Sequence, residues 1–168
     1  APMALCLTGD TQLVLGDGSL RSIGSLAEEY TQDKEASYSV LTLNKEGRVV
    51  PGILHEPRKT RTMAEIVKVD FTGGESITCT PDHLFGLADG SYIRADRLRR
   101  DSELAPINGR TIKVHQVSGY GRADVYDAAV PGVENFLIGF KDSPYKVKVH
   151  NCAGGTGGGK ALSVDTTI

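Results

Sequence analysis

Polar and apolar residues alternate along several short segments of the chain. The clearest is 65–71, which reads as a half-buried β-strand. The same alternation, less regular, marks 37–43, 49–54, 91–94 and 146–149. Turn-forming pairs recur between such runs: Asp17-Gly18, Gly73-Gly74, Asp89-Gly90 and Asn108-Gly109.

Helical periodicity is confined to two places. In 23–30 the side chains of Ile23, Leu26, Ala27 and Tyr30 fall at helical spacing, and a short helical turn is expected near 95–99. Many short strands with regular turns and so little helix predict an all-β domain of complex, non-meander topology.

Composition allows one domain of ordinary size. The chain has 168 residues, of which 39% are hydrophobic and 24% charged, so a packed core is expected and intrinsic disorder is not. A net charge of −2 argues against a general nucleic-acid binder. No apolar run reaches the length of a membrane span, and no signal peptide precedes Cys6, so a cytoplasmic location is expected.

The last part of the chain has a different character. Residues 153–160 are nearly all glycine and cannot form a strand or helix alone, which places the domain boundary at about Asn151. Residues 161–168 repeat residues 6–13 in part, with Ala161 standing where the first copy has Cys6.

Three cysteines without a secretory signal do not suggest a disulfide framework. Cys6 and Cys152 therefore become candidates for chemistry, since a thiol is the most nucleophilic side chain near neutral pH. The plain alternative for Cys6 is a small buried hydrophobe at the start of a strand.

Two further motifs combine residues suited to acyl transfer. In Thr80-Pro81-Asp82-His83 the proline forces a turn, so that a hydroxyl and an imidazole can reach one peptide group. In the segment His150-Asn151-Cys152 the asparagine amide could attack its own carbonyl, with the histidine protonating the leaving amine. The plain alternatives are a surface turn and a polar strand end.

The glycine-rich segment 154–160 fits G-x-x-x-x-G-K, the phosphate-binding loop, except at its last position. Ala161 stands where a Ser or Thr would ligate Mg²⁺. The segment also lacks its own strand and helix, so a working nucleotide site is not expected, and a flexible linker is the plain alternative.

The order of these motifs is more specific than any one of them. Residues 6–11 resemble the N-terminal block of self-splicing inteins, 74–85 the block with Thr-x-x-His, 125–136 the block before the last strand, and 149–152 the C-terminal junction. The sequence therefore resembles the intein family over nearly its whole folded length. One departure is Glu134, where inteins usually have His.

The resemblance implies an all-β Hint (hedgehog/intein) fold, horseshoe-like, with many short strands and one or two short helices. It also implies boundaries: 1–5 as N-extein, 6–151 as the intein, and 152–160 as C-extein. Because about 40 residues of no helical bulk separate His83 from Asp127, it implies a mini-intein without a homing endonuclease.

The resemblance further implies a role for each matching residue. Cys6 would form a thioester with Leu5, Thr80 and His83 would polarise the amide between them, and Cys152 would take over the acyl chain. Asp127 would tune the protonation of the two cysteines. Asn151, assisted by His150, would cyclise and release the intein, with no cofactor and no metal.

The flanking exteins would be the substrate of a monomeric domain that binds no membrane and no nucleic acid. Because 152–160 resembles a phosphate loop, the expected host is a P-loop ATPase. The partial repeat predicts that a second intein, disabled at Ala161, begins within 161–168.

Two alternatives remain at this level. A Hint-type autoprocessing domain would cleave or transfer without ligation and would not need the His-Asn-Cys end. A non-enzymatic β module could instead bind nucleotide through Lys160 or zinc through Cys6, Cys152, His83 and His150, although no typical zinc-ligand spacing is present.

Overall fold

The computed structural model describes residues 5–151, which form two antiparallel sheets and one α-helix. The first sheet has the strand order β4-β5-β6-β1-β9, with β5 also pairing with β9, and the second has the order β3-β2-β10-β11-β7-β8. The strands are β1 Leu7–Thr8, β2 Gln12–Val14, β3 Leu20–Ser22, β4 Ser37–Leu43, β5 Val49–Phe71, β6 Ser76–Cys79, β7 Leu84–Gly86, β8 Tyr92–Arg94, β9 Val114–Ala129, β10 Asn135–Phe140 and β11 Ser143–His150.

Helix α1 spans Ile23–Gln32, two residues beyond the predicted end. The hydroxyl of Ser22 caps its N-terminus by accepting a hydrogen bond from the backbone N–H of Ser25. Ile23, Leu26 and Ala27 form its buried face. The predicted second helical turn is the 3₁₀ helix η1, Ala95–Arg97.

The largest difference from the sequence prediction is a long two-stranded ribbon. Residues 49–54 and 65–71 were expected as separate strands, but both belong to the 23-residue strand β5, which pairs with the 16-residue β9. The register between them shifts at several β-bulges, and Glu56 and Met63 have positive φ there. Irregular residues at the bulges interrupt the alternation of polar and apolar residues. The sequence pattern therefore predicted two separate strands where the structure has one.

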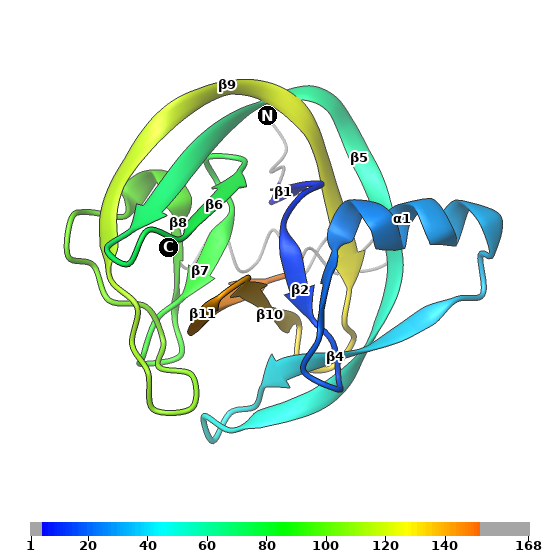
Figure 1. Ribbon diagram of the computed structural model, residues 1–168, viewed down its shortest axis with the longest axis horizontal. Coiled ribbons are helices and arrows are strands. Elements are labelled where there is room, and N and C mark those ends of the chain that lie inside the picture. The colour runs from blue at the N-terminus through cyan, green and yellow to red at the C-terminus, as the bar shows by residue number, and fades with distance from the viewer. Residues whose placement is uncertain (1–4, 152–168) are drawn as a thin grey trace.

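The ribbon encloses the start of the domain (Figure 1). Figure 1 shows β5 and β9 as two long curved strands that arch over β1, β2, β6 and β7, which confirms the predicted horseshoe-like all-β fold. Strand β1 pairs with β6 on one side and β9 on the other, while β5 pairs with both β6 and β9. The pairings of these four strands therefore form a closed ring, and Cys6 directly precedes β1, one of its members.

The end of the domain lies in the second sheet. Strand β10 is buried along five of its six residues and pairs with β11 throughout. The buried side chain of Asn135 accepts from the Leu43 N–H and donates to the Leu43 carbonyl, both at 2.9 Å, and so joins β10 to β4. Strand β11 also pairs with β7 through Val149 and Phe85, which connects the end of the domain to the Thr80–His83 turn.

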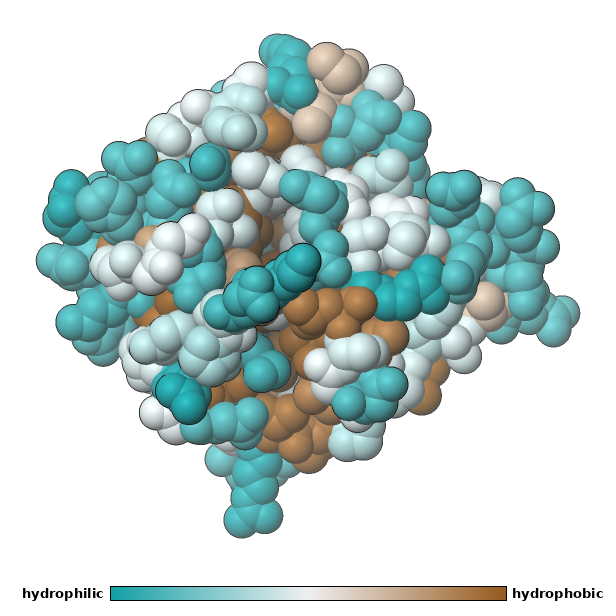
Figure 2. Space-filling view, in the orientation of Figure 1, coloured by the Kyte–Doolittle hydropathy of each residue, from teal (hydrophilic) through white to brown (hydrophobic). Residues whose placement is uncertain are grey.

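The surface seen in this orientation is mostly hydrophilic at its rim (Figure 2). Figure 2 shows apolar residues gathered near the centre and lower part of this face. Most buried hydrophobic side chains belong to a single cluster that draws on both sheets and α1, so the two sheets share one core.

Candidate active site

The turn between β6 and β7 carries Thr80 and His83. The His83 N–H donates to the Thr80 carbonyl at 3.1 Å, which closes the turn around Pro81. Two bonds tie the turn to η1: the Ala95 N–H donates to His83, and the Asp96 N–H donates to Pro81. Both functional side chains are therefore held on rigid backbone, each 1% exposed.

Thr80 holds the peptide groups of Cys6 on both sides. Its hydroxyl oxygen accepts the Cys6 N–H at 3.0 Å, and its own N–H donates to the Cys6 carbonyl at 2.9 Å. The Cys6 N–H belongs to the amide between Leu5 and Cys6, so the Thr80 hydroxyl contacts the bond that the intein resemblance marks for cleavage.

Leu5 has an unusual backbone for a leucine. Its φ is 46°, a region that costs a non-glycine residue about 1–3 kcal/mol and persists only where the surroundings impose it. The surroundings here are a buried side chain, 1% exposed, and a hydrogen bond of 3.1 Å from the Leu5 N–H to Asp82 Oδ1. The strain lies next to the candidate scissile bond.

The imidazole of His83 is neutral at physiological pH. Burial lowers the pKa of His83 to about 4, while the nearby Leu5 carbonyl and the Asp82 carboxylate oppose this effect and His150 adds to it. Neither ring nitrogen makes a hydrogen bond of normal geometry within residues 5–151. The ring therefore faces the Leu5 carbonyl with one N–H and one lone pair available.

This neutral histidine predicts a specific acid instability. A histidine titrates near pH 6.5 in the unfolded chain, so between pH 6.5 and about 4 the unfolded state binds the extra proton. Stability is therefore full above about pH 6.5 and falls by up to about 3 kcal/mol as pH decreases to about 4.

Urea unfolding at pH 7 and pH 4.5 measures this loss in a background with Cys6→Ala and Asn151→Ala, which blocks the chemistry at both junctions and keeps the chain intact. His83→Gln should remove most of it. The matched control is His115→Gln at an exposed histidine, which should leave the loss unchanged. An acid loss equal in all three chains would contradict the assignment.

His150 and Asn151 lie at the end of β11, next to the Thr80–His83 turn. Because Val149 pairs with Phe85 in antiparallel register, continuing the register sets Asn151 opposite His83. The Asn151 N–H donates to the Glu134 carbonyl at 3.0 Å. Its side chain is fully buried, and neither amide atom has a hydrogen-bond partner within residues 5–151.

Tyr92 packs against His150, and Lys148 and Glu134 act on this pair of rings. The Tyr92 ring meets the His150 ring edge-to-face at 5.0 Å, and the Lys148 ammonium lies 4.9 Å from the Tyr92 ring centre. Burial lowers the pKa of His150, and the positive charge of Lys148 adds to this. Burial, followed by the Glu134 carboxylate, raises the pKa of Tyr92 to about 12. The imidazole is thus packed and neutral beside Asn151.

Asp127 lies on β9 beside the start of the chain. Leu7 pairs with Tyr126 and Thr8 with Val125, so one further step of the register sets Asp127 opposite Cys6. Its side chain is 4% exposed. The structure thus brings six predicted residues to one buried region, whereas Cys152 lies outside the described residues. The six are Cys6, Thr80, His83, Asp127, His150 and Asn151.

Three residues at this region were not predicted as functional. Asp82 lies inside the Thr-x-x-His motif, where its contact with Leu5 could have been suspected. Thr60 contacts the Cys6 sulfur, and Tyr92 contacts His150, but each sits in an ordinary strand sequence with no motif. Thr60 and Tyr92 are identified only by these contacts in the folded chain.

Within residues 5–151 no three His, Cys, Asp or Glu side chains are grouped to hold a metal ion. No helix in that range is long and apolar enough to span a membrane.

Comparison with solved structures identifies the architecture. The DnaB intein from Synechocystis sp. PCC 6803 matches with a TM-score of 0.72 and 21% identity, over 87% of this chain and 97% of that one. The chain has the intein fold. The bacterial intein-like domain from Clostridium thermocellum (TM-score 0.71, 22% identity, 89% and 100% covered) and the transcription factor IIB Mvu mini-intein (0.67, 18%, 88% and 100%) share it.

The predicted fold class is therefore confirmed, as is the resemblance to mini-inteins at the level of the intein fold. No family model matches the sequence. A curated relative, the DNA gyrase B protein of Synechocystis sp., is 40% identical over 114 residues, which cover 68% of this chain and 10% of that protein. The chain thus spans about a tenth of the length of this relative.

Proposed function

We propose that this domain is a self-splicing intein, which excises itself and ligates its flanking segments. One observation carries the proposal. Strand β6 pairs with the beginning of the domain through Cys79 and Leu7, and β7 pairs with its end through Phe85 and Val149. The Thr80–His83 turn that connects β6 to β7 therefore lies between the two junctions, which are 145 residues apart in sequence, from Cys6 to Asn151. Proximity of this kind is what intramolecular acyl transfer requires.

The first step is an acyl shift at Leu5. The Cys6 sulfur bonds to the Leu5 carbonyl carbon, the Leu5–Cys6 amide bond breaks, and the thiol proton ends on the Cys6 amine. The Thr80 hydroxyl holds that amide by accepting the Cys6 N–H, and the strained Leu5 backbone raises the energy of the starting state. The neutral His83 has the protonation state to accept and return the proton.

The second step moves the acyl chain. The Cys152 thiol attacks the carbonyl carbon of Leu5 in the new thioester, and the bond between that carbon and the Cys6 sulfur breaks. The product is a branched intermediate. Asp127, in register beside Cys6, is suited to receive and return the protons of the two thiols.

The third step releases the domain. Asn151 Nδ2 attacks its own carbonyl carbon, the bond to Cys152 breaks, and a proton passes to the new amine. The Asn151 amide is buried without a hydrogen-bond partner among the described residues, so no bond there needs to break before it attacks. His150 supplies the proton transfer, and the freed Cys152 amine then attacks the thioester to restore a peptide bond.

On this proposal residues 1–5 are N-extein, 6–151 the intein and 152 onward C-extein. The stretch between His83 and Asp127 forms β7, β8, η1 and most of β9, all parts of the same fold. That arrangement supports a mini-intein, within the described residues, with no room for an endonuclease domain.

The host protein is a separate proposal with two candidates. Residues 152–160 resemble a phosphate loop and support a P-loop ATPase host, whereas the similarity to a gyrase B protein supports a gyrase-like host. Residues 161–168 resemble a second, disabled intein start. Residues 152–168 lie outside the described structure, so sequencing beyond Ile168 is the test. A monomeric, cytoplasmic domain that binds no nucleic acid remains our expectation.

The Hint-type autoprocessing alternative shares this fold and would use the same Cys6, Thr80 and His83. It is not favoured, because it gives no use to the buried Asn151 amide, which has no partner in the described part of the chain. The decisive test is the product of the isolated chain: splicing joins Leu5 to Cys152, and cleavage alone leaves the two ends separate.

A further inference from the structure

Thr60 occupies a bulge in β5 that faces Cys6. Lys59 pairs with Tyr126 and Arg61 with Val125, so the register with β9 shifts between them and leaves Thr60 as the extra residue. The same two β9 residues pair with Leu7 and Thr8 on the other side. A bulge redirects a side chain out of the regular alternation. This one turns the Thr60 hydroxyl across β9 toward the residue before Leu7.

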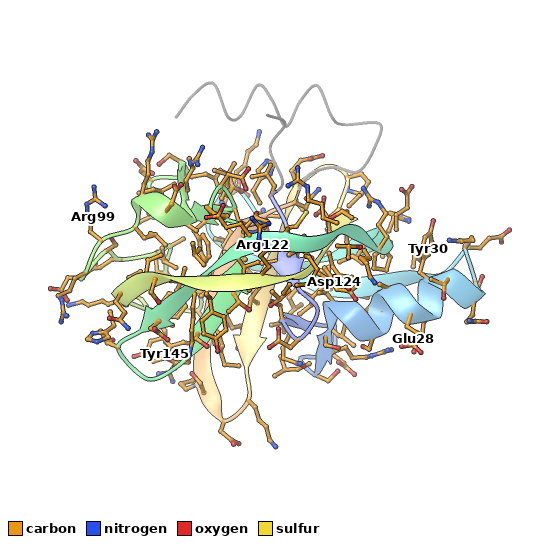
Figure 3. The ribbon with its side chains drawn as sticks, turned by 90° about the horizontal axis from the view of Figure 1, so that it is seen from above. Glu28, Tyr30, Arg99, Arg122, Asp124 and Tyr145 are labelled. Carbon is orange, nitrogen blue, oxygen red and sulfur yellow. The ribbon has the colours of Figure 1, made fainter. Side chains whose placement is uncertain are left out.

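The bulge is fixed by its neighbours on the ribbon. Lys59 forms a salt bridge with Asp124 at 3.0 Å, and Asp124 also accepts the N–H of Met63 at 3.1 Å. Arg122 donates to the Met63 carbonyl at 3.2 Å. Figure 3 shows Arg122 and Asp124 on the same long strand of the ribbon. The contacts of Lys59 and Met63 with β9 thus fix the segment that carries Thr60.

The Thr60 hydroxyl makes two contacts of different kinds. Its oxygen lies 2.9 Å from Cys6 Sγ and 3.3 Å from the Val125 carbonyl oxygen. The carbonyl can only accept, so while Cys6 is a thiol the hydroxyl donates to Val125 and the thiol donates to Thr60. When the thiol loses its proton, rotation about one bond turns the hydroxyl hydrogen to the sulfur.

We propose that the Thr60 hydroxyl is a catalytic group of the first step, which it assists by hydrogen-bonding the Cys6 thiolate before attack on Leu5. The inference rests on the proposed splicing function. Cys6 is 3% exposed, so water is largely excluded as a partner for the thiolate, and an ionised sulfur at such a position needs a donor. The charged or titratable groups around it are His83 and Asp82 from the β6–β7 turn, Asp127 from β9, and Cys79 from β6.

The test isolates the first step. In a background with Asn151→Ala and Cys152→Ala, excess dithiothreitol captures the thioester and releases residues 1–5 at a rate measured by mass spectrometry between pH 6 and 9. Thr60→Val removes the hydroxyl at constant shape, and Thr60→Ser retains it. Thr62→Val, at an exposed threonine two residues further along β5, is the matched control.

We expect Thr60→Val to raise the Cys6 pKa, read from the pH dependence of alkylation, by about one unit. The thiolate fraction at pH 7 then falls about tenfold. Because a less stabilised thiolate is the better nucleophile, the cleavage rate falls less, about three- to fivefold. The difference in cleavage rate between Thr60→Val and the parent should become smaller as pH rises. Thr60→Ser and Thr62→Val should stay within about twofold of the parent.

Two results would overturn the inference. One is a Thr60→Val chain whose rate and alkylation profile match the parent at every pH. The other is a Thr60→Ser chain as slow as Thr60→Val, which would assign the effect to packing of the methyl group. If the parent itself releases nothing with dithiothreitol, the proposed function fails instead.

Discussion

Replacing Asn151 with Ala leaves the bond between residues 151 and 152 uncut. The amide nitrogen that attacks the carbonyl is then missing, and the alanine side chain has no nucleophilic atom to replace it. The first junction keeps Cys6, Thr80 and His83, so the thioester and branched species accumulate. Mass spectrometry of the purified chain, with and without a thiol, should show release of residues 1–5 but no succinimide product.

Cys6→Ala should give the reverse pattern. It removes the nucleophile of the first step, so splicing and thiol-induced release both fall below detection, while Asn151 can still cyclise slowly. Asn44→Ala, at a turn residue outside the site, is the control and should splice as the parent does. If either Asn151→Ala or Cys6→Ala left the product pattern unchanged, the assigned chemistry would be wrong.

His83→Gln should slow thioester formation by about 10²-fold or more, the range that a positioned acid–base group contributes. Glutamine retains hydrogen-bonding atoms but cannot carry a proton from sulfur to nitrogen. Because His83 faces the Leu5 carbonyl, the effect should fall on the first step. The rate of dithiothreitol-induced cleavage in the Asn151→Ala background measures it.

The same substitution separates catalysis from structure. Asn151 cyclisation, followed in a Cys6→Ala background, should change by less than about tenfold, since His150 and its contact with Tyr92 remain. Exposed His115→Gln should leave both steps unchanged. Equal loss of both steps would indicate a general structural role for His83, and no loss would remove it from the mechanism.

The sequence predicted the fold well where elements are locally regular. The helix from Ile23, the strand β4 and the end of β11 follow from periodicity and turn residues. The long ribbon did not, because β5 and β9 contain bulges whose irregular residues hide one continuous pairing. Which strands are neighbours across the ribbon is a property of the folded chain, and no local pattern contains it.

The candidate site shows the same division. Residues within motifs, such as Cys6, His83 and Asn151, could be predicted because their order along the chain is specific. Thr60 and Tyr92 could not, since their relevance comes from contact with a residue far away in sequence. The strain at Leu5 also has no sequence signal, because packing against the Asp82 turn imposes it.

The most direct test of the central claim is the identity of the ligated product. The chain is incubated at neutral pH with a reductant that does not capture thioesters, and its small products are sequenced by tandem mass spectrometry. Splicing predicts a peptide in which Leu5 is followed directly by Cys152, together with a domain of residues 6–151 that ends in a succinimide. If residues 1–5 and 152–168 appear only as separate peptides, or the chain stays intact, the account is contradicted.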